Sequence, residues 1–135
     1  MSMFEHSIRV YWEDTDAGGV VFYANYLKFF ERARTEWLRA LGFSQQAMRL
    51  NDDAMFVVSS TALRYLSPAR LDDQLRVTVE LREQGRVSLS VFQQAWCNER
   101  LLAEGEIRIG CVGAQDFKPR RIPAPLQQLL QSAPY

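Results

Sequence analysis

Three acidic side chains and a pair of glycines are the residues most able to do chemistry in this sequence. Glu13, Asp14 and Asp16 lie within one four-residue stretch, and Gly18 and Gly19 follow them before an aromatic, helix-prone segment. A carboxylate such as Asp16 can act as a nucleophile or a general base. Glycines let a ligand approach the backbone, and the start of a helix offers unpaired N–H groups that stabilise a carbonyl oxygen gaining negative charge. The stretch predicts either an oxyanion-stabilising site beside Asp16 or an acidic turn that only suits a helix N-terminus.

Other candidates for catalysis are weaker. His6 is the single histidine, so a multi-histidine metal site is not expected. Ser59 and Ser60 fall in a strand-like run without the G-x-S-x-G pattern of a nucleophile elbow. Cys97 and Cys111 lack C-x-x-C spacing and do not precede a helix, so we expect buried thiols rather than nucleophiles or a disulfide. The sequence predicts no metal and no cofactor.

Composition and charge narrow the class of protein. The chain of 135 residues is long enough for one domain with a core, which we expect to span residues 1–135. Sixteen Lys and Arg balance sixteen Asp and Glu, which argues against nucleic acid as a partner. The apolar runs are too short for membrane insertion, and the N-terminus lacks the pattern of a signal peptide. We therefore expect a cytoplasmic globular protein.

The first half of the chain predicts a strand followed by helices. Residues 4–13 alternate, which indicates a strand with Ile8, Val10 and Trp12 on one side. Residues 24–41 change to a helical period, with a capping glycine, Gly42, at the end. A serine, Ser44, can then cap a second short helix. The apolar stripe of the long helix comprises Tyr26, Phe30, Ala33, Trp37 and Leu41.

The second half predicts strands joined by short turns. Runs at residues 55–66, 74–82, 86–97 and 101–113 are rich in β-forming residues, and a weak helical piece follows at 126–131. Short loops between the last three runs favour antiparallel hairpins. The expected fold class is α+β, with about five antiparallel strands and one long helix. Because one helix is narrow, the sheet's remaining face and edges predict an oligomer.

The specific sequence adds a family resemblance. RVYWEDTDAGGVVFYANYLKFFERART resembles the motif of the 4-hydroxybenzoyl-CoA thioesterase family of hotdog-fold proteins, and within it the YbgC-type acyl-CoA thioesterases. LGFSQQAM, FVVSSTALRYLSPARLDD and KPRRIP are also similar to segments of that family. The resemblance implies a hotdog fold, in which an antiparallel sheet wraps a long helix, and pairing of subunits into dimers and often homotetramers.

The resemblance also implies roles for residues of the acidic stretch. Asp16 would be the catalytic carboxylate, as nucleophile or general base, and the backbone N–H of Tyr23 would polarise the thioester carbonyl. Gly19 would admit the substrate, and Val20 and Tyr26 would contact it. Asp14 would then be a local support or a turn residue facing solvent, and Glu13 a residue facing solvent.

Basic residues late in the chain are candidates for the coenzyme A phosphates. Arg86 falls near a basic loop that similar thioesterases use for the nucleotide end. Lys118, Arg120 and Arg121 form the densest basic cluster of the sequence. A solvated loop explains these residues equally well.

Three functions remain open at this stage. The leading hypothesis is an acyl-CoA thioesterase that hydrolyses a thioester of CoA, or of acyl carrier protein, to acid and thiol. The second is a scaffold with little turnover that binds acyl carrier protein or associates with the Tol-Pal envelope system. The third is a hotdog dehydratase that uses His6, which lies outside the acidic stretch.

Overall fold

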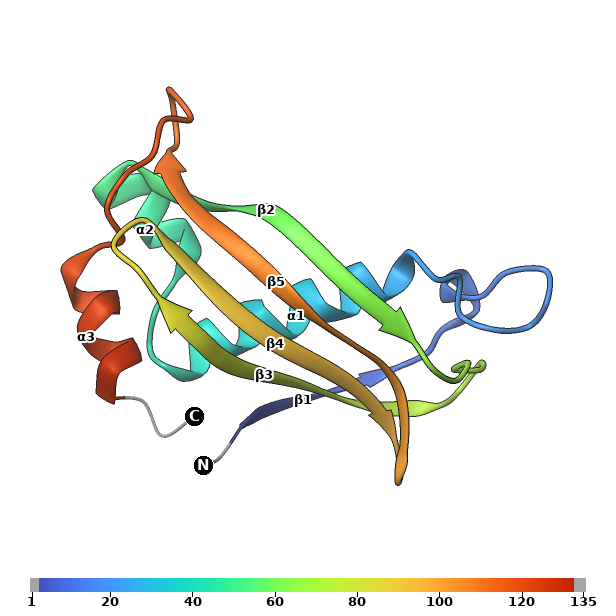
Figure 1. Ribbon diagram of the computed structural model, residues 1–135. Helices are drawn as coiled ribbons and strands as arrows, with labels where there is room; N and C mark the ends of the chain where they lie inside the picture. The colour runs from blue at the N-terminus through green and yellow to red at the C-terminus, as the bar shows by residue number, and fades with distance from the viewer. Residues whose placement is uncertain (1–2, 133–135) are drawn as a thin grey trace.

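The computed structural model describes residues 3–132 and contains one five-stranded sheet with three α-helices (Figure 1). In chain order the elements are β1 (Phe4–Arg9), a 3-10 turn (Trp12–Asp14), α1 (Asn25–Ala40), α2 (Gln45–Asp52), β2 (Ala54–Tyr65), β3 (Gln74–Gln84), β4 (Ser88–Cys97), β5 (Arg100–Gly113) and α3 (Ala124–Ser132). Within the described range, none of the helices combines the length and the apolar character that crossing a bilayer would need.

All strand pairs in the sheet are antiparallel, in the order β1-β3-β4-β5-β2. The last three strands form consecutive hairpins, as the short loops predict. β1 joins the far side of β3, with Phe4 opposite Val79, whereas β2 pairs with β5. The sheet curves around α1 (Figure 1), so the predicted α+β arrangement is confirmed.

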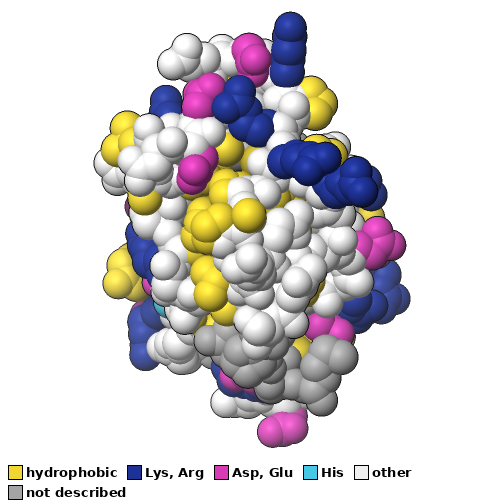
Figure 2. Space-filling model, turned by 90° about the vertical axis from the view of Figure 1, so that its left-hand side faces the viewer, with side chains coloured by type: hydrophobic (Ala, Val, Ile, Leu, Met, Phe, Trp, Pro, Cys, Tyr) yellow, Lys and Arg dark blue, Asp and Glu magenta, His cyan; other side chains and the backbone are white. Residues whose placement is uncertain are grey.

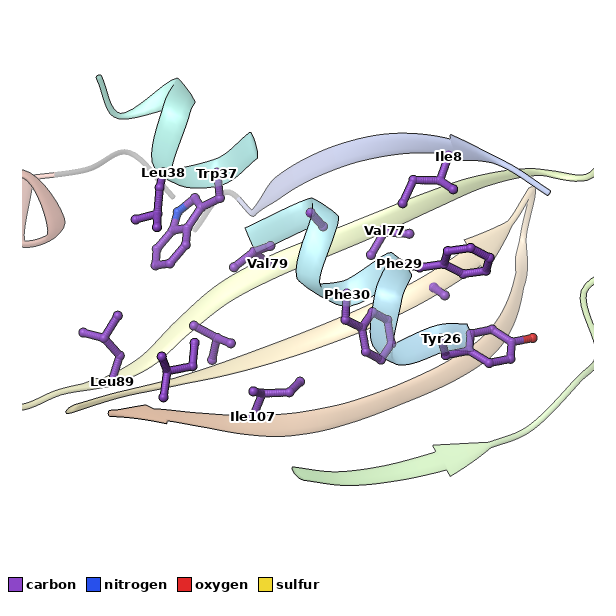
Figure 3. Close-up of a cluster of buried hydrophobic side chains, with 14 of the residues drawn as sticks. Ile8, Tyr26, Phe29, Phe30, Trp37, Leu38, Val77, Val79, Leu89 and Ile107 are labelled. Carbon is purple, nitrogen blue, oxygen red and sulfur yellow. The ribbon is translucent and has the colours of Figure 1, made fainter. Parts of the chain in front are cut away.

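The core lies between α1 and the inner face of the sheet. The predicted stripe is confirmed at four buried positions, whereas Leu41 is half-buried. Phe29 and Leu38 are buried as well, which widens the apolar face of the helix. Figure 3 shows Trp37 and Leu38 at one end of this face and Tyr26 at the other. Each large side chain removed from water contributes about 1.5–3 kcal/mol, so this face fixes the helix against the sheet.

Both predicted helix boundaries after α1 are confirmed. Gly42 has a φ of 85°, which favours glycine, and its N–H donates to the carbonyl of Arg39 over 2.9 Å. The hydroxyl of Ser44 accepts a hydrogen bond from the N–H of Ala47 over 3.2 Å and caps α2. The chain therefore turns sharply from α1 into α2.

The prediction of a strand over residues 4–13 is wrong at its end. β1 stops at Arg9, and a 3-10 turn follows at Trp12–Asp14. The turn closes because the carboxylate of Asp14 accepts a hydrogen bond from the N–H of Tyr11 over 2.8 Å. Trp12 is consequently 81% exposed instead of sharing the buried side with Ile8.

Candidate active site

Asp14 ties the end of the first strand region to the start of α1. Its side chain is buried and holds the N–H of Tyr11, as described above. Its backbone carbonyl accepts hydrogen bonds from the N–H of Phe22 over 3.0 Å and from the side-chain amide of Asn25 over 2.9 Å. The acidic stretch is thus held at both ends, and Asp14 acts as the local support.

The residues between these anchors form a tight loop. The N–H of Asp16 donates to the carbonyl of Val20 over 2.9 Å, and the N–H of Gly19 donates back to the carbonyl of Asp16 over 3.0 Å. Gly19 has a φ of 76°, a left-handed conformation that a residue with a Cβ adopts only at a cost. Val21 fastens the loop to the β2–β3 connection, because its N–H donates to the carbonyl of Ala69 over 2.8 Å.

The carboxylate of Asp16 is exposed at the edge of this loop. One carboxylate oxygen accepts a hydrogen bond from the N–H of Gly18 over 2.8 Å, which orients the group. Asp16 has no ion-pair partner among residues 3–132. The side chain is therefore held in position and remains available to a ligand.

The start of α1 has unpaired backbone donors. The N-cap residue, Ala24, offers no side-chain cap, and the first turn of the helix carries no acidic residue. In the described part of the chain, the N–H groups of Tyr23 and Ala24 donate no hydrogen bond. Unpaired donors together with the positive end of the helix dipole favour an oxygen with developing negative charge.

Three tyrosines flank the helix start. The rings of Tyr23 and Tyr65 meet edge to face with centroids 5.9 Å apart, and Tyr26 lies 5.6 Å from Tyr65. Burial raises the pKa of Tyr26, whose hydroxyl accepts a hydrogen bond from the N–H of Ala69 over 3.3 Å. Partial burial and the nearby Tyr23 raise the pKa of Tyr65. Both phenols stay protonated at neutral pH, so they supply apolar surface and O–H donors rather than a base.

Four of the predicted site residues line two separate hollows of the single chain. Asp16 and Gly19 line a hollow of about 530 Å³ that also contains Trp12. Tyr23 and Tyr26 line another, shallow hollow of about 300 Å³, which residues of the β2–β3 connection border. Val20 lines neither hollow and instead forms a β-bridge with Arg70.

The basic candidates lie far from Asp16 within one chain. Figure 1 places the loop before α1 at one end of the sheet and the segments around α3 at the other. Arg86 and Arg121 line a hollow of about 600 Å³ beside α3. Arg120 is engaged by Asp53, with nitrogen and oxygen 3.2 Å apart, and Lys118 is exposed. Figure 2 shows Lys and Arg side chains gathered next to an apolar patch on this end of the molecule.

Two residues with clear roles were not anticipated from the sequence. Asn25 anchors the helix start, but an asparagine in the first turn is too common to be noticed. Gln93 is fully buried in β4 and bridges the sheet to α1. The sequence feature that could have revealed Gln93 is its polar side chain at a position of β4 where the alternation pattern expects an inward, apolar residue. Among residues 3–132, no group of three or more His, Cys, Asp or Glu is placed to hold a metal ion.

Comparison with known proteins gives consistent matches. A family model described as the thioesterase superfamily matches residues 18–104. An acyl-CoA thioester hydrolase YbgC from Escherichia coli O6:H1 is 46% identical over 124 residues, which cover 90% of this chain and 91% of the relative. A 1,4-dihydroxy-2-naphthoyl-CoA hydrolase from Thermosynechococcus vestitus is 33% identical and covers 96% of this chain and 90% of its own.

The fold also matches solved structures. A 1,4-dihydroxy-2-naphthoyl-CoA thioesterase from Synechocystis superposes with a TM-score of 0.89 at 22% identity, covering 99% of each chain. At this identity the likeness concerns the fold alone. The expected hotdog arrangement, a curved antiparallel sheet around a long helix, is confirmed.

Proposed function

Because the chain belongs to the thioesterase superfamily, we propose that it hydrolyses acyl-CoA thioesters to a free acid and coenzyme A. The names of its relatives support a CoA thioester as substrate. The observation that carries the proposal is the placement of Asp16 in a hydrogen-bonded loop that leads into an uncapped helix start with free N–H groups.

Thioester hydrolysis requires few catalytic groups. A thiolate is a good leaving group, so hydrolysis requires only an activated oxygen nucleophile and stabilisation of the carbonyl oxygen. The N–H of Tyr23 would receive that oxygen, while Asp16 either attacks the carbonyl carbon or removes a proton from the attacking water. The carbon–sulfur bond then breaks, and the thiolate takes up a proton. Where Asp16 attacks directly, the acyl group is left on its carboxylate as a mixed anhydride, which a water molecule hydrolyses to the free acid and regenerated Asp16. Gly19 and Val20 would shape the entrance, and Tyr26 would form part of the acyl wall.

A second copy of the chain would complete this site. Among residues 3–132, β2 is an edge strand whose one partner is β5, and its segment from Val58 to Ala62 is exposed. Such an open edge is a ready template for another strand. Pairing two copies of β2 about a two-fold axis is necessarily antiparallel. We therefore propose a homodimer through β2, from which a tetramer could be built.

This pairing would also bring the basic residues to Asp16. β2 begins at Ala54, in the wall of the hollow that contains Arg86 and Arg121, and ends at Tyr65 beside Tyr23. Antiparallel alignment sets the Ala54 end of one copy near the Tyr65 end of the other. The partner's arginines, together with its Lys118 and Arg120, would then face the CoA phosphates of a substrate bound at Asp16.

The proposal is tested by thiol release from CoA thioesters with short aliphatic, long aliphatic and aromatic acyl groups. We expect Asp16→Asn to lower kcat by about 100-fold or more, because a positioned carboxylate contributes that much as a general base. The amide oxygen of the variant can still accept the Gly18 hydrogen bond, so the loop should persist. Glu13→Gln, which removes an exposed carboxylate of the same stretch, is the matched control and should retain activity within about twofold.

Wild-type rates in Asp16→Asn would remove Asp16 from the mechanism. Negligible turnover by the wild-type protein on every CoA and acyl carrier protein thioester would overturn the proposed activity. If acyl carrier protein still bound under those conditions, the scaffold alternative would be favoured instead.

A further inference from the structure

A cavity of about 280 Å³ lies between the second half of α1 and the sheet. Its apolar wall comes from the helix and from three strands, and includes Leu38, Phe56, Leu89 and Ile109. This volume is close to the lower limit of small-molecule sites, which start at about 300 Å³. The cavity shares no lining residue with the hollows around Asp16 and Tyr23.

The cavity contains a half-buried cation without a counter-ion. Arg34 lines the wall and forms no ion pair with any of residues 3–132. Its one hydrogen bond goes to the side-chain carbonyl of Gln93, over 3.0 Å. Desolvation lowers the pKa of Arg34, while the charge of Glu31 opposes that change. An arginine stays protonated in proteins, so a partly desolvated positive charge faces this space.

The position of Arg34 is fixed by a buried network. The amide nitrogen of Gln93 donates to the carbonyl of Phe30 over 3.0 Å and to the carbonyl of Thr78 over 3.2 Å. The amide oxygen of Gln93 is therefore turned toward Arg34. The remaining N–H groups of the guanidinium donate no hydrogen bond within the described chain. They are pre-organised donors.

A second donor of the same wall is also unpaired. Trp37 lines the cavity and is 1% exposed. Its indole N–H is the one buried side-chain polar group in residues 3–132 that lacks a hydrogen-bond partner. Buried indole N–H groups usually have a hydrogen-bond partner. The unpaired N–H of Trp37 therefore indicates that a bound ligand supplies the acceptor.

We propose that this cavity binds a small organic carboxylate with an apolar body, whose oxygens accept hydrogen bonds from Arg34 and Trp37. A carboxylate supplies both the negative charge that Arg34 lacks and the acceptor that Trp37 lacks. The apolar body would contact Leu89 and Ile109. Glu31, the acidic side chain of the described wall, is exposed and remains solvated.

The test is a titration followed by the indole N–H signals of ¹⁵N-labelled protein. The chain has 3 tryptophans, and Trp37→Phe assigns the relevant signal. Benzoate should move the Trp37 proton downfield and saturably, because the indole gains an acceptor. Benzyl alcohol, which has a similar shape without the charge, should bind much more weakly. A Trp37 signal that stays unmoved throughout the benzoate titration, or that moves equally with both compounds, would overturn the proposal.

Variants of the arginine identify the charged contact. Arg34→Gln should weaken benzoate binding about tenfold or more, since it removes a charge-assisted hydrogen bond. Arg32→Gln, on an exposed part of the same helix, is the control and should bind as the wild type does. If Arg34→Gln does not fold, Arg34→Lys serves in its place, since it keeps the charge but not the planar fork. Wild-type affinity in a folded Arg34 variant would contradict the proposed contact.

The carboxylate could come from a free acid or from the far end of an acyl group that carries a second carboxylate. Hydrolysis kinetics with glutaryl-CoA, which carries a terminal carboxylate, and valeryl-CoA, which does not, separate these sources. This experiment rests on the proposed hydrolysis. A rise in KM for glutaryl-CoA alone in Arg34→Lys indicates the acyl group. Unchanged KM values with weaker inhibition by benzoate indicate a free acid. Unchanged KM values together with unchanged inhibition would overturn the proposal. The titration does not depend on turnover, so failure of the hydrolase proposal would be visible separately.

Discussion

The side-chain amide of Asn25 donates a hydrogen bond to the backbone carbonyl of Asp14 over 2.9 Å. This contact joins the first residue of α1 to the last residue of the 3-10 turn. The loop that carries Asp16 lies between these two residues in the chain, so its ends are held at a fixed separation. We therefore expect the orientation of Asp16 relative to the helix start to depend on this hydrogen bond.

Asn25→Ala should loosen the loop. Loss of one side-chain hydrogen bond costs about 1 kcal/mol of unfolding free energy, measured by chemical denaturation. We also expect kcat to fall while KM changes less, because Asn25 positions the site rather than touching the substrate. Asn51→Ala, at an exposed position of α2, is the control and should change stability by less than about 0.5 kcal/mol. Equal unfolding free energies of the two variants would show that the hydrogen bond between Asn25 and Asp14 does not stabilise the fold.

The two glycines of the loop should respond differently to alanine. A Cβ at Gly19 meets no atom within 4 Å, so Gly19→Ala pays only for its left-handed backbone, about 1–2 kcal/mol. Gly19→Asn should cost less, because asparagine tolerates this conformation. A Cβ at Gly18 would lie 3.2 Å from a carboxylate oxygen of Asp16, so Gly18→Ala should disturb activity more than stability. Denaturation and thiol-release assays on the same preparations check both statements. Equal losses of stability and of activity in Gly18→Ala and Gly19→Ala would contradict them.

Glu104 should contribute stability that disappears in acid. Hydrogen bonds from Gln94 first and then from Arg64 lower the pKa of Glu104 below its ordinary value. A carboxyl whose pKa is lower in the folded state stabilises above its unfolded pKa, about 4.3, and loses that contribution as the pH falls through the folded pKa. The stability gap between wild type and Glu104→Gln should therefore close between neutral and strongly acidic pH. Glu106→Gln, at an exposed position of β5, is the control for the removal of a surface carboxylate. A gap for Glu104→Gln that stays constant down to strongly acidic pH would contradict the prediction.

Subunit mixing tests whether one site uses two chains. Asp16→Asn should be inactive, and Arg86→Gln combined with Arg121→Gln should raise KM for acyl-CoA. In a mixed dimer, one site would receive an intact Asp16 from one chain and intact arginines from the other. Mixing and reassembling the two variants should therefore recover part of the wild-type activity, up to about half of the sites in each mixed dimer. If proven heterodimers recover no activity, the proposal of a shared site is contradicted. Either Asp16 and the arginines then serve a site within one chain, or the arginines do not bind the substrate.

Much of the fold follows from periodicity in the sequence. The stripe on α1 and the alternation in β3 predict which faces are buried, because burial repeats with the period of the element. The end of β1 could not be predicted in this way. It depends on a side-chain contact between Asp14 and Tyr11, which no alternation pattern records. The pairing of β2 with β5 is equally hidden, since both strands have neighbours closer in sequence.

The sequence singles out candidate site residues but does not predict their geometry. The motif singles out Asp16, Gly19 and Tyr23, and the structure places them in the segment between the 3-10 turn and α1. Spacing alone could not show that Asp16 and Tyr23 line different hollows, because that depends on how the loop folds back onto the β2–β3 connection. Arg34 looked like one more polar residue of an amphipathic helix. Its importance comes from Gln93, which is 59 residues away in the chain.

The register between β1 and β3 has a consequence for how the chain folds during synthesis. β1 pairs with the first part of β3, with Arg9 opposite Gln74 and Phe4 opposite Val79, so during synthesis β1 has no partner in the sheet until that part of β3 has been made. Loops of this length are costly to close, and contacts of high sequence separation form slowly. α1 and α2 can form locally in the meantime, because each needs only its own segment of chain. We therefore expect β1 to join the sheet only after α1, α2 and the paired part of β3 have been made.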